Sequence, residues 1–153
     1  MAIFHLVNEA GKYMDDKALE QVSGYIIRGA KKTLYYGTSE GFVAEDMAIV
    51  QGYYNKADGK KLKHYVISFS KAESPSVSQM ESIARKICEE EYSKGYQIIA
   101  GIHVKKDQNH LHIMMNTVNA KTAERLHQSR KEFFDERKKI GKLLDDYGIK
   151  LED

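Results

Sequence analysis

The chain has 153 residues, of which 42% are hydrophobic and 30% charged, and its formal net charge is +2. This length and composition predict one soluble globular domain, and so small a net charge makes no case for a nucleic-acid partner by itself. The sequence has no apolar run of membrane-spanning length, no signal-peptide pattern at its start and a single cysteine, Cys88. These features predict a cytoplasmic protein and exclude an intrachain disulfide.

Hydrophobic periodicity predicts five strands and four helices, in the order β-α-β-α-β-α-β-β-α. The expected strands cover 2–8, 33–38, 62–70, 96–104 and 110–118, and the expected helices cover 15–29, 44–56, 75–95 and about 123–147. Asp15 is placed to cap the first helix, and Gly95 to end the third. Because the last two strands form a hairpin, we expect an α+β fold with a mostly antiparallel central sheet and flanking helices.

The hairpin contains three of the six histidines, in the stretch HVKKDQNHLHIMMN that runs from His103 to Asn116. His110 and His112 alternate along one strand, so they share a face, and a register that pairs His103 with His110 brings the third imidazole to that face. Three imidazoles there would leave coordination positions open for water or substrate, as in catalytic metal sites. The alternative is a set of half-buried polar side chains with no metal.

A covalent nucleophile is the second element of the predicted site. Of ten tyrosines, Tyr25 stands out because it lies near a helix end, directly before the basic stretch RGAKK at 28–32. A tyrosine beside cations and a metal can attack phosphorus and hold a phosphotyrosine. Tyr147 is the competing tyrosine, but Asp145 and Asp146 are expected to oppose its ionisation and to repel a phosphate.

Three segments, in order, resemble the relaxases, the mobilisation nucleases of plasmids and integrative elements, in the MobP-type branch of the HUH endonucleases. They are LEQVSGYIIRGAKKT, KHYVISFS and HVKKDQNHLHIMMNTVN. The resemblance implies an HUH-nuclease-like palm, with Tyr25 as nucleophile and His103, His110 and His112 as metal ligands. It also gives four residues a supporting or phosphate-contacting place: His64, Ser68, Asp107 and Asn116. Lys105 stands where the family often has an aspartate, and the segment after Tyr25 is one residue longer than expected.

The resemblance further implies that the chain nicks single-stranded DNA at an origin-of-transfer hairpin and rejoins it through a 5′-phosphotyrosyl intermediate. The implied cofactor is a divalent metal, Mg or Mn first, with Zn, Ni or Co as alternatives. The implied partners are this DNA and accessory relaxosome proteins. Residues 1–153 would form one relaxase domain, as the N-terminal part of a longer protein or as a small complete one. The cations expected to contact DNA are Arg28, Lys31, Lys32, Lys105 and Lys106.

Two other readings stay open at this point. A single-tyrosine HUH transposase or a rolling-circle replication initiator would use the same metal chemistry with Tyr147 as nucleophile. A DNA-binding module without catalysis would form no covalent adduct.

Overall fold

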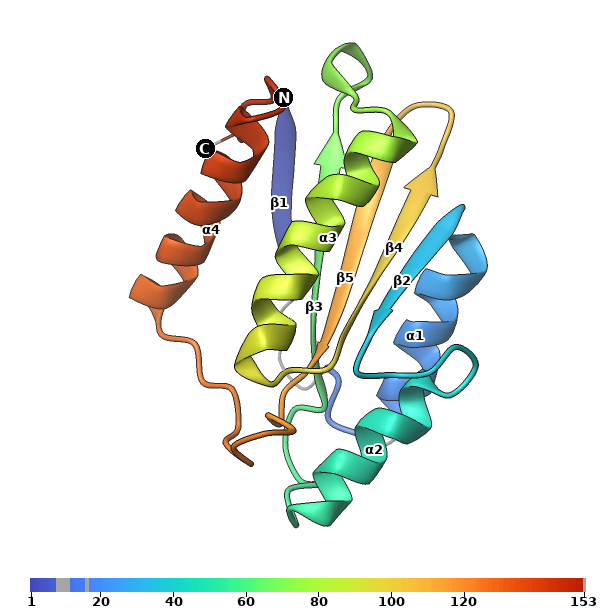
Figure 1. Cartoon of the computed structure of the whole chain (residues 1–153), viewed down its shortest axis with the longest axis vertical. Helices are drawn as coiled ribbons and strands as arrows, with labels where there is room; N and C mark the ends of the chain where they lie inside the picture. Colours follow the sequence, from blue (N-terminus) through green and yellow to red (C-terminus); the bar gives the residue numbers. More distant parts are fainter. Residues whose placement is uncertain (8–11, 16, 153) are drawn as a thin grey trace.

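One antiparallel sheet forms the middle of the molecule in the computed structural model, which describes residues 1–7, 12–15 and 17–152 (Figure 1). The strand order is β1-β3-β5-β4-β2, and every neighbouring pair is antiparallel. The strands are β1 (Ala2–Val7), β2 (Lys32–Tyr36), β3 (Leu62–Phe69), β4 (Ile98–Val104) and β5 (Asn109–Asn116). The helices are α1 (Lys17–Gly29), α2 (Val43–Tyr53), the single 3₁₀ turn η1 (Lys71–Glu73), α3 (Val77–Lys94) and α4 (Arg130–Asp145). The predicted α+β class with an antiparallel sheet is confirmed.

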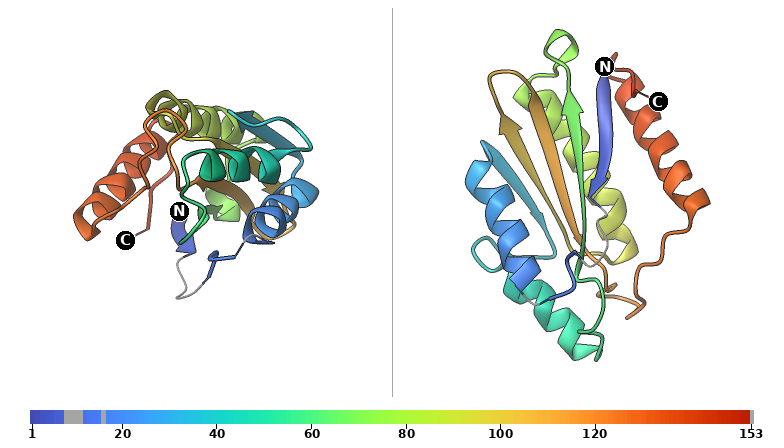
Figure 2. Two further views of the ribbon diagram at one scale, coloured as in Figure 1. Left: turned by 90° about the horizontal axis from the view of Figure 1, so that it is seen from below. Right: turned by 180° about the vertical axis from the view of Figure 1, so that it is seen from behind.

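The helices cover the two faces of the sheet unequally. On one face α3 and α4 pack through a large apolar cluster that includes Phe69, Met80 and Ile113. On the other face α1 and α2 pack through a smaller cluster around Ile26, Met47 and Ile99. Seen from behind, α1 lies over the β2–β4 side of the sheet, while no described helix lies over β5, β3 and β1 at the same height (Figure 2). The second face is therefore left partly open.

The β4–β5 hairpin has the register that the predicted histidine cluster requires. His103 of β4 pairs with His110 of β5, and Ser68 of β3 pairs with His110 from the other side. Because side chains alternate along each strand, these residues share a face with His112 and His64. That face is the partly open one.

Local signals set helix ends where they were expected at two of the four helices, α1 and α3. The Asp15 carboxylate accepts hydrogen bonds from the backbone N–H groups of Lys17 and Ala18 at the start of α1. Ser76 and Gln79 form a capping box at the start of α3, and Gly95 ends that helix in the left-handed conformation, with φ at 112°. No helix in the described part of the chain is both long and apolar enough to cross a membrane.

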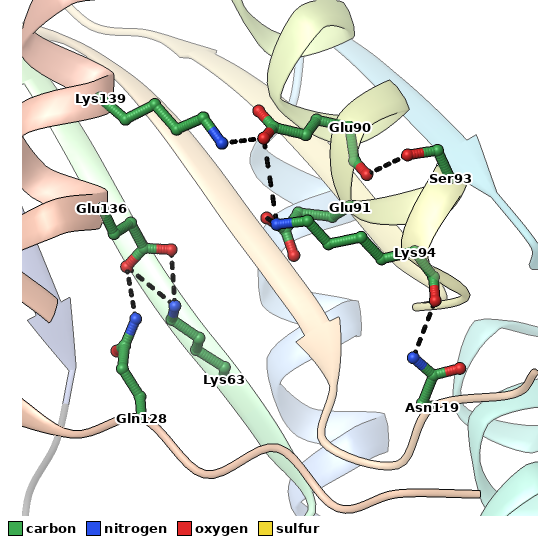
Figure 3. Close-up of polar contacts among 9 residues, drawn as sticks. All are labelled: Lys63, Glu90, Glu91, Ser93, Lys94, Asn119, Gln128, Glu136 and Lys139. Atoms are coloured by element: carbon green, nitrogen blue, oxygen red, sulfur yellow. Dashed lines mark hydrogen bonds and ion pairs between the residues drawn. The ribbon is translucent and has the colours of Figure 1, made fainter. Parts of the chain in front are cut away.

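The expected start of the last helix near residue 123 is wrong, because α4 begins at Arg130. The Asn119 side chain accepts hydrogen bonds from the N–H groups of Lys121 and Thr122, which holds a turn in place of a first helical turn. Ser129 then caps α4 in a box with Glu132. Polar contacts tie this segment and α4 to α3 and β3 (Figure 3). Lys139 pairs with Glu90, Lys63 pairs with Glu136, and Asn119 donates a hydrogen bond to the Lys94 carbonyl.

Candidate functional site

Four histidines from three adjacent strands meet on the partly open face. His112 lies in the middle of the group: its ring centroid is 4.2 Å from that of His103, 5.6 Å from His64 and 6.0 Å from His110. The structure therefore brings together all three histidines of the predicted ligand set and adds His64 beside them. This cluster is where the strand alternation predicted it.

Burial lowers the pKa of three of these four imidazoles. Loss of solvation lowers the pKa of His112 to about 3, and the neighbouring His103, His64 and His110 add to that shift. Burial, followed by Lys12 and His5, lowers the pKa of His64 to about 4. Burial also lowers the pKa of His110. A neutral imidazole is the form that donates a lone pair to a metal ion, so the lowered pKa values of His64, His110 and His112 favour the protonation state that coordination requires.

The nitrogens of the cluster have different partners. His103 donates its Nε2–H to the Ile26 carbonyl at 2.7 Å, because a carbonyl oxygen can only accept, so in the neutral ring Nδ1 is the nitrogen with the lone pair. Nε2 of His110 lies 3.3 Å from the Gln108 amide oxygen. Nε2 of His112 is buried and has no hydrogen-bond partner among the described residues. An unpartnered buried nitrogen is a group for which a ligand is expected.

A divalent metal of the borderline class fits this donor set by its chemistry, since imidazole nitrogens are common ligands of such metals and Nε2 of His112 is buried without a partner among the described residues. Within residues 1–7, 12–15 and 17–152, however, no group of three histidine, cysteine, aspartate or glutamate side chains is arranged to hold a metal ion. The rings of His103 and His110 are turned toward Ile26 and Gln108 instead. The three-histidine ligand set stays a prediction.

Tyr25 lies beside this cluster. Its ring centroid is 5.5 Å from that of His112 and 5.9 Å from that of His103, and the residue keeps 49% of its surface exposed. It projects from α1, whose neighbouring Ile26 is fully buried against the sheet. The predicted nucleophile comes from the first of the three sequence segments and the predicted metal ligands come from the third. The fold thus brings these two segments together.

Two glycines allow α1 to approach the sheet this closely. A Cβ on Gly101 of β4 would lie 2.5 Å from Cγ2 of Ile26 and 3.2 Å from its carbonyl oxygen. A Cβ on Gly29, at the end of α1, would lie 2.7 Å from Cε1 of His103. Any side chain at either position would push the helix, and Tyr25 with it, away from the histidines.

The remaining predicted residues are divided between the site and its surroundings. Ser68 is half-buried on the histidine face, opposite His110. Asp107 is exposed in the loop between β4 and β5. Asn116 is fully buried under α2, where its amide donates to Gln97 and the Met47 carbonyl and accepts from Gln51. Asn116 therefore anchors α2 to the sheet and is too buried to contact DNA.

The predicted DNA-contacting cations do not all lie on one side. Arg28 and Lys31 are exposed at the end of α1, close in sequence to Tyr25, and Lys105 and Lys106 are exposed at the tip of the hairpin. The Lys32 ammonium instead forms an ion pair at 2.8 Å with Glu81 of α3, on the opposite face of the sheet. We therefore leave Lys32 out of the proposed DNA surface.

Tyr147 lies far from the histidine cluster in the fold, between the end of α4 and α3. Its hydroxyl is 2.7 Å from that of Ser82 and accepts a hydrogen bond from the Lys86 ammonium at 3.1 Å. These two hydrogen bonds lower its pKa, with Asp146 opposing them as the smallest contribution. Asp146 thus opposes ionisation as expected, but Ser82 and Lys86, which are brought in from another helix, outweigh it.

Sequence reasoning missed Tyr13. This buried tyrosine lies 3.0 Å, through its hydroxyl, from Nδ1 of His64, and Nε2 of His64 is 3.3 Å from Nδ1 of His112. The segment around Tyr13 belongs to no predicted strand or helix, so it carried no periodic signal that could have placed the residue.

A hollow of about 630 Å³ lies on the other face, between β1 and the segment that leads into α4. Phe4, Leu6 and Phe133 line its apolar part, and Lys60 and Arg125 lie at its polar part. The Arg125 guanidinium is held there by the carbonyls of the loop before β3. The hollow shares no lining residue with the histidine cluster.

Comparison with known proteins gives the class of this site. The family model described as "Relaxase: MobA/VirD2-like, nuclease domain" matches residues 25–149. The chain therefore belongs to the relaxase family, through a match to its nuclease domain.

Two individual proteins are also similar to this chain. A stretch of 61 residues, 40% of this chain, is 36% identical to Protein MobA of Acidithiobacillus ferrooxidans, and it spans only 15% of that protein. The solved structure "MobM Relaxase Domain (MOBV; Mob_Pre) bound to 26nt pMV158 oriT DNA" matches 99% of this chain and 89% of its own, with a TM-score of 0.64 and 15% identity. That second likeness shows that the two chains share a fold.

Proposed function

We propose that this domain nicks single-stranded DNA at an origin of transfer and rejoins it, with Tyr25 as the nucleophile. The observation that carries the proposal is the position of the half-exposed Tyr25 ring within 6 Å of two histidine rings, on a face that the described helices leave partly open. A nucleophilic hydroxyl next to side chains that can bind a metal ion is the arrangement that a covalent phosphoryl-transfer site needs.

The chemistry is an exchange of esters. The Tyr25 oxygen attacks the scissile phosphorus and forms a new P–O bond while the bond to the 3′ oxygen breaks. The phenol loses its proton, the departing 3′ oxygen gains one, and the phosphate stays attached to the 5′ end as a phosphotyrosine. The number of phosphate ester bonds does not change, so rejoining by a 3′-hydroxyl needs no nucleotide cofactor.

The histidines supply the place for a divalent ion, which relaxases generally use. His112 would hold it through its unpartnered Nε2, with His103 and His110 as the further ligands. When bound, such an ion stabilises the negative charge that develops on the non-bridging phosphate oxygens. Mg or Mn is our first choice, with Zn, Ni and Co as alternatives.

The DNA would pass the end of α1 and the tip of the β4–β5 hairpin. Arg28, Lys31, Lys105 and Lys106 are exposed there and can neutralise phosphates on both sides of Tyr25. An origin-of-transfer hairpin as substrate and accessory relaxosome proteins as partners belong to this proposal. The MobM structure bound to its oriT DNA supports the choice of substrate through the shared fold.

The deciding experiment is a covalent-adduct assay. The protein is incubated with labelled single-stranded DNA that carries an origin-of-transfer sequence and Mn²⁺, and the products are separated on a denaturing gel. We expect a shifted protein–DNA species that disappears in Tyr25→Phe and persists in Tyr147→Phe, the matched change on the far face. Mass spectrometry should map the nucleotide to Tyr25. A nucleotide on Tyr147 would support the transposase-like reading, and DNA binding without any adduct would support the non-catalytic one.

A further inference from the structure

Tyr13, His64 and His112 form a hydrogen-bonded chain that ends at the unpartnered nitrogen of the cluster. The Tyr13 hydroxyl is 3.0 Å from Nδ1 of His64, and Nε2 of His64 is 3.3 Å from Nδ1 of His112. The two imidazole rings stack with an interplanar angle of 24°. At the far end, Nε2 of His112 is buried and has no hydrogen-bond partner.

The protons of this chain can be arranged in two directions. If His64 donates its Nε2–H to His112, then Nε2 of His112 carries the proton and has no lone pair for a metal ion. If His112 donates its Nδ1–H to His64, then His64 donates its own Nδ1–H to the Tyr13 oxygen, and Nε2 of His112 keeps its lone pair. Only the second direction is compatible with coordination.

We infer that Tyr13 and His64 are positioning residues that hold His112 in the Nδ1–H form and so direct its Nε2 lone pair to the metal ion. His64 supplies the acceptor for the proton of His112, and Tyr13 supplies the acceptor for the proton of His64. Histidine ligands are commonly oriented in this way by a partner on the second ring nitrogen. The inference rests on the proposed function, in which His112 is a metal ligand.

The backbone of Tyr13 indicates that its place is enforced by the fold. Tyr13 has a φ of 66°, in the left-handed region that residues with a side chain seldom occupy, and it is 9% exposed. Its carbonyl accepts the backbone N–H of Lys61 at 2.7 Å, three residues before His64. This conformation persists only where the surroundings hold it, and such positions gather at functional sites.

The first test reads the tautomer directly in metal-free protein. Nitrogen-15 spectra of the histidine rings, recorded in the presence of a chelator, should show His112 protonated on Nδ1 and unprotonated on Nε2. In Tyr13→Phe, which loses only the accepting oxygen, the signals of His112 should shift toward the Nε2–H form. A wild-type His112 protonated on Nε2 would overturn the inference.

The second test measures Mn²⁺ affinity by calorimetry. We expect His64→Leu to weaken binding by about 10- to 100-fold and Tyr13→Phe by a smaller factor. His64→Gln places an amide oxygen near the former Nε2, so it should recover much of the affinity lost in His64→Leu. Tyr147→Phe, which removes a hydroxyl hydrogen-bonded on the opposite face, is the control and should bind as the wild type.

The outcomes separate this inference from the function on which it rests. If His112→Ala abolishes Mn²⁺ binding while His64→Leu binds as the wild type, the positioning role is refuted and the ligand set stands. If His112→Ala itself binds Mn²⁺ normally, the ligand set fails, and the inference fails with it. If His64→Leu loses affinity and its thermal unfolding in chelator matches that of His64→Gln, misfolding does not explain the loss, and the inference is supported.

Discussion

The contacts of His112 show how much a single side chain in this cluster depends on its neighbours. Its ring lies against those of His103 and His64 and near that of Tyr25, so three aromatic rings set its environment. Burial, followed by the neighbouring histidines, lowers the pKa of His112, which leaves its ring neutral where a metal ion is expected to bind. Removing this one side chain should therefore affect metal binding and catalysis together.

We expect His112→Ala, like treatment of the wild type with a chelator, to lower adduct formation at least about 100-fold, because charge on the transferring phosphate is then not stabilised. The assay is adduct yield against time on a denaturing gel. His5→Ala is the control: His5 is exposed on β1, pairs with Val66 and lies on the same face of the sheet. Full adduct formation by the wild type in chelator would contradict a metal requirement.

Two adjacent lysines provide a matched test of the DNA path. Lys31 is exposed beside the end of α1, whereas Lys32 is paired with Glu81 on the opposite face. Lys31→Ala should weaken single-strand binding roughly threefold and flatten the salt dependence by about 0.7 in the log–log slope, the amount for one phosphate contact. Lys32→Ala should leave both unchanged. Fluorescence anisotropy over a salt series measures the two effects, and the reverse ranking would place DNA on the other face.

At the scale of elements, the close contact between α1 and β4 positions the nucleophile. The helix rests on Gly101, and the His103 side chain bonds to the Ile26 carbonyl in the last turns of the helix. This hydrogen bond and the buried Ile26 side chain fix both the height and the rotation of α1 over the hairpin. Tyr25 is therefore placed by the packing of α1 on strand β4 of the hairpin.

Gly101→Ala should destabilise the fold by about 1–3 kcal/mol, since the added methyl meets Ile26 in a packed core. It should also lower adduct yield in the molecules that remain folded, because α1 shifts with Tyr25. Gly52→Ala in α2 is the control: nothing lies within 4 Å of its Cβ, so this change should stabilise by about 0.5–1 kcal/mol. Urea unfolding measures both, and equal stability of the two variants would show that α1 can shift without cost.

Over the whole molecule, the sheet lies between the larger apolar core and the histidine cluster. The large apolar cluster with α3 and α4 lies on one face, and the histidines lie on the other, next to the smaller cluster with α1 and α2. The ion pairs of Figure 3 tie α4 to α3 and β3 on the apolar side. Strand β5, which carries two of the histidines, is central and therefore hydrogen-bonded on both edges.

The buried histidines make the stability of the metal-free protein depend on pH. The pKa values of His112 and His64, about 3 and about 4 in the folded state, lie below the ordinary histidine value of 6.5. The unfolded chain therefore takes up protons first as the pH falls. Their contribution is fully present above about pH 6.5 and is lost as the pH falls toward the folded values. We expect the free energy of unfolding to fall by an amount on the order of a few kcal/mol across this window.

Urea titrations in chelator at pH 7 and pH 5 measure this effect, and most carboxyl groups remain ionised over that range. His112→Asn should show a weaker pH dependence than the wild type, since it removes one of the two groups. An identical dependence in the two proteins would mean that His112 is not a source of the effect.

The pairing of His103 with His110, which the predicted cluster required as a condition, is met in the structure. The order and class of the elements and the shared face of His110 and His112 could be predicted from the sequence. These follow from periodicity and strand alternation, which are local properties of the backbone. Sequence reasoning placed the start of α4 several residues too early, because the side-chain hydrogen bonds of Asn119 outweigh helical periodicity there.

Only the tertiary structure decided which side chains from distant segments meet. It brought Tyr13 to His64, closed Tyr25 over the histidines, turned Lys32 to the far face and enclosed Asn116 beneath α2. It also lowered the pKa of Tyr147 through Ser82 and Lys86, against the effect of its sequence neighbours. Such contacts depend on how helices pack on a sheet, and packing is set by shape and burial over the whole chain, which no local pattern encodes.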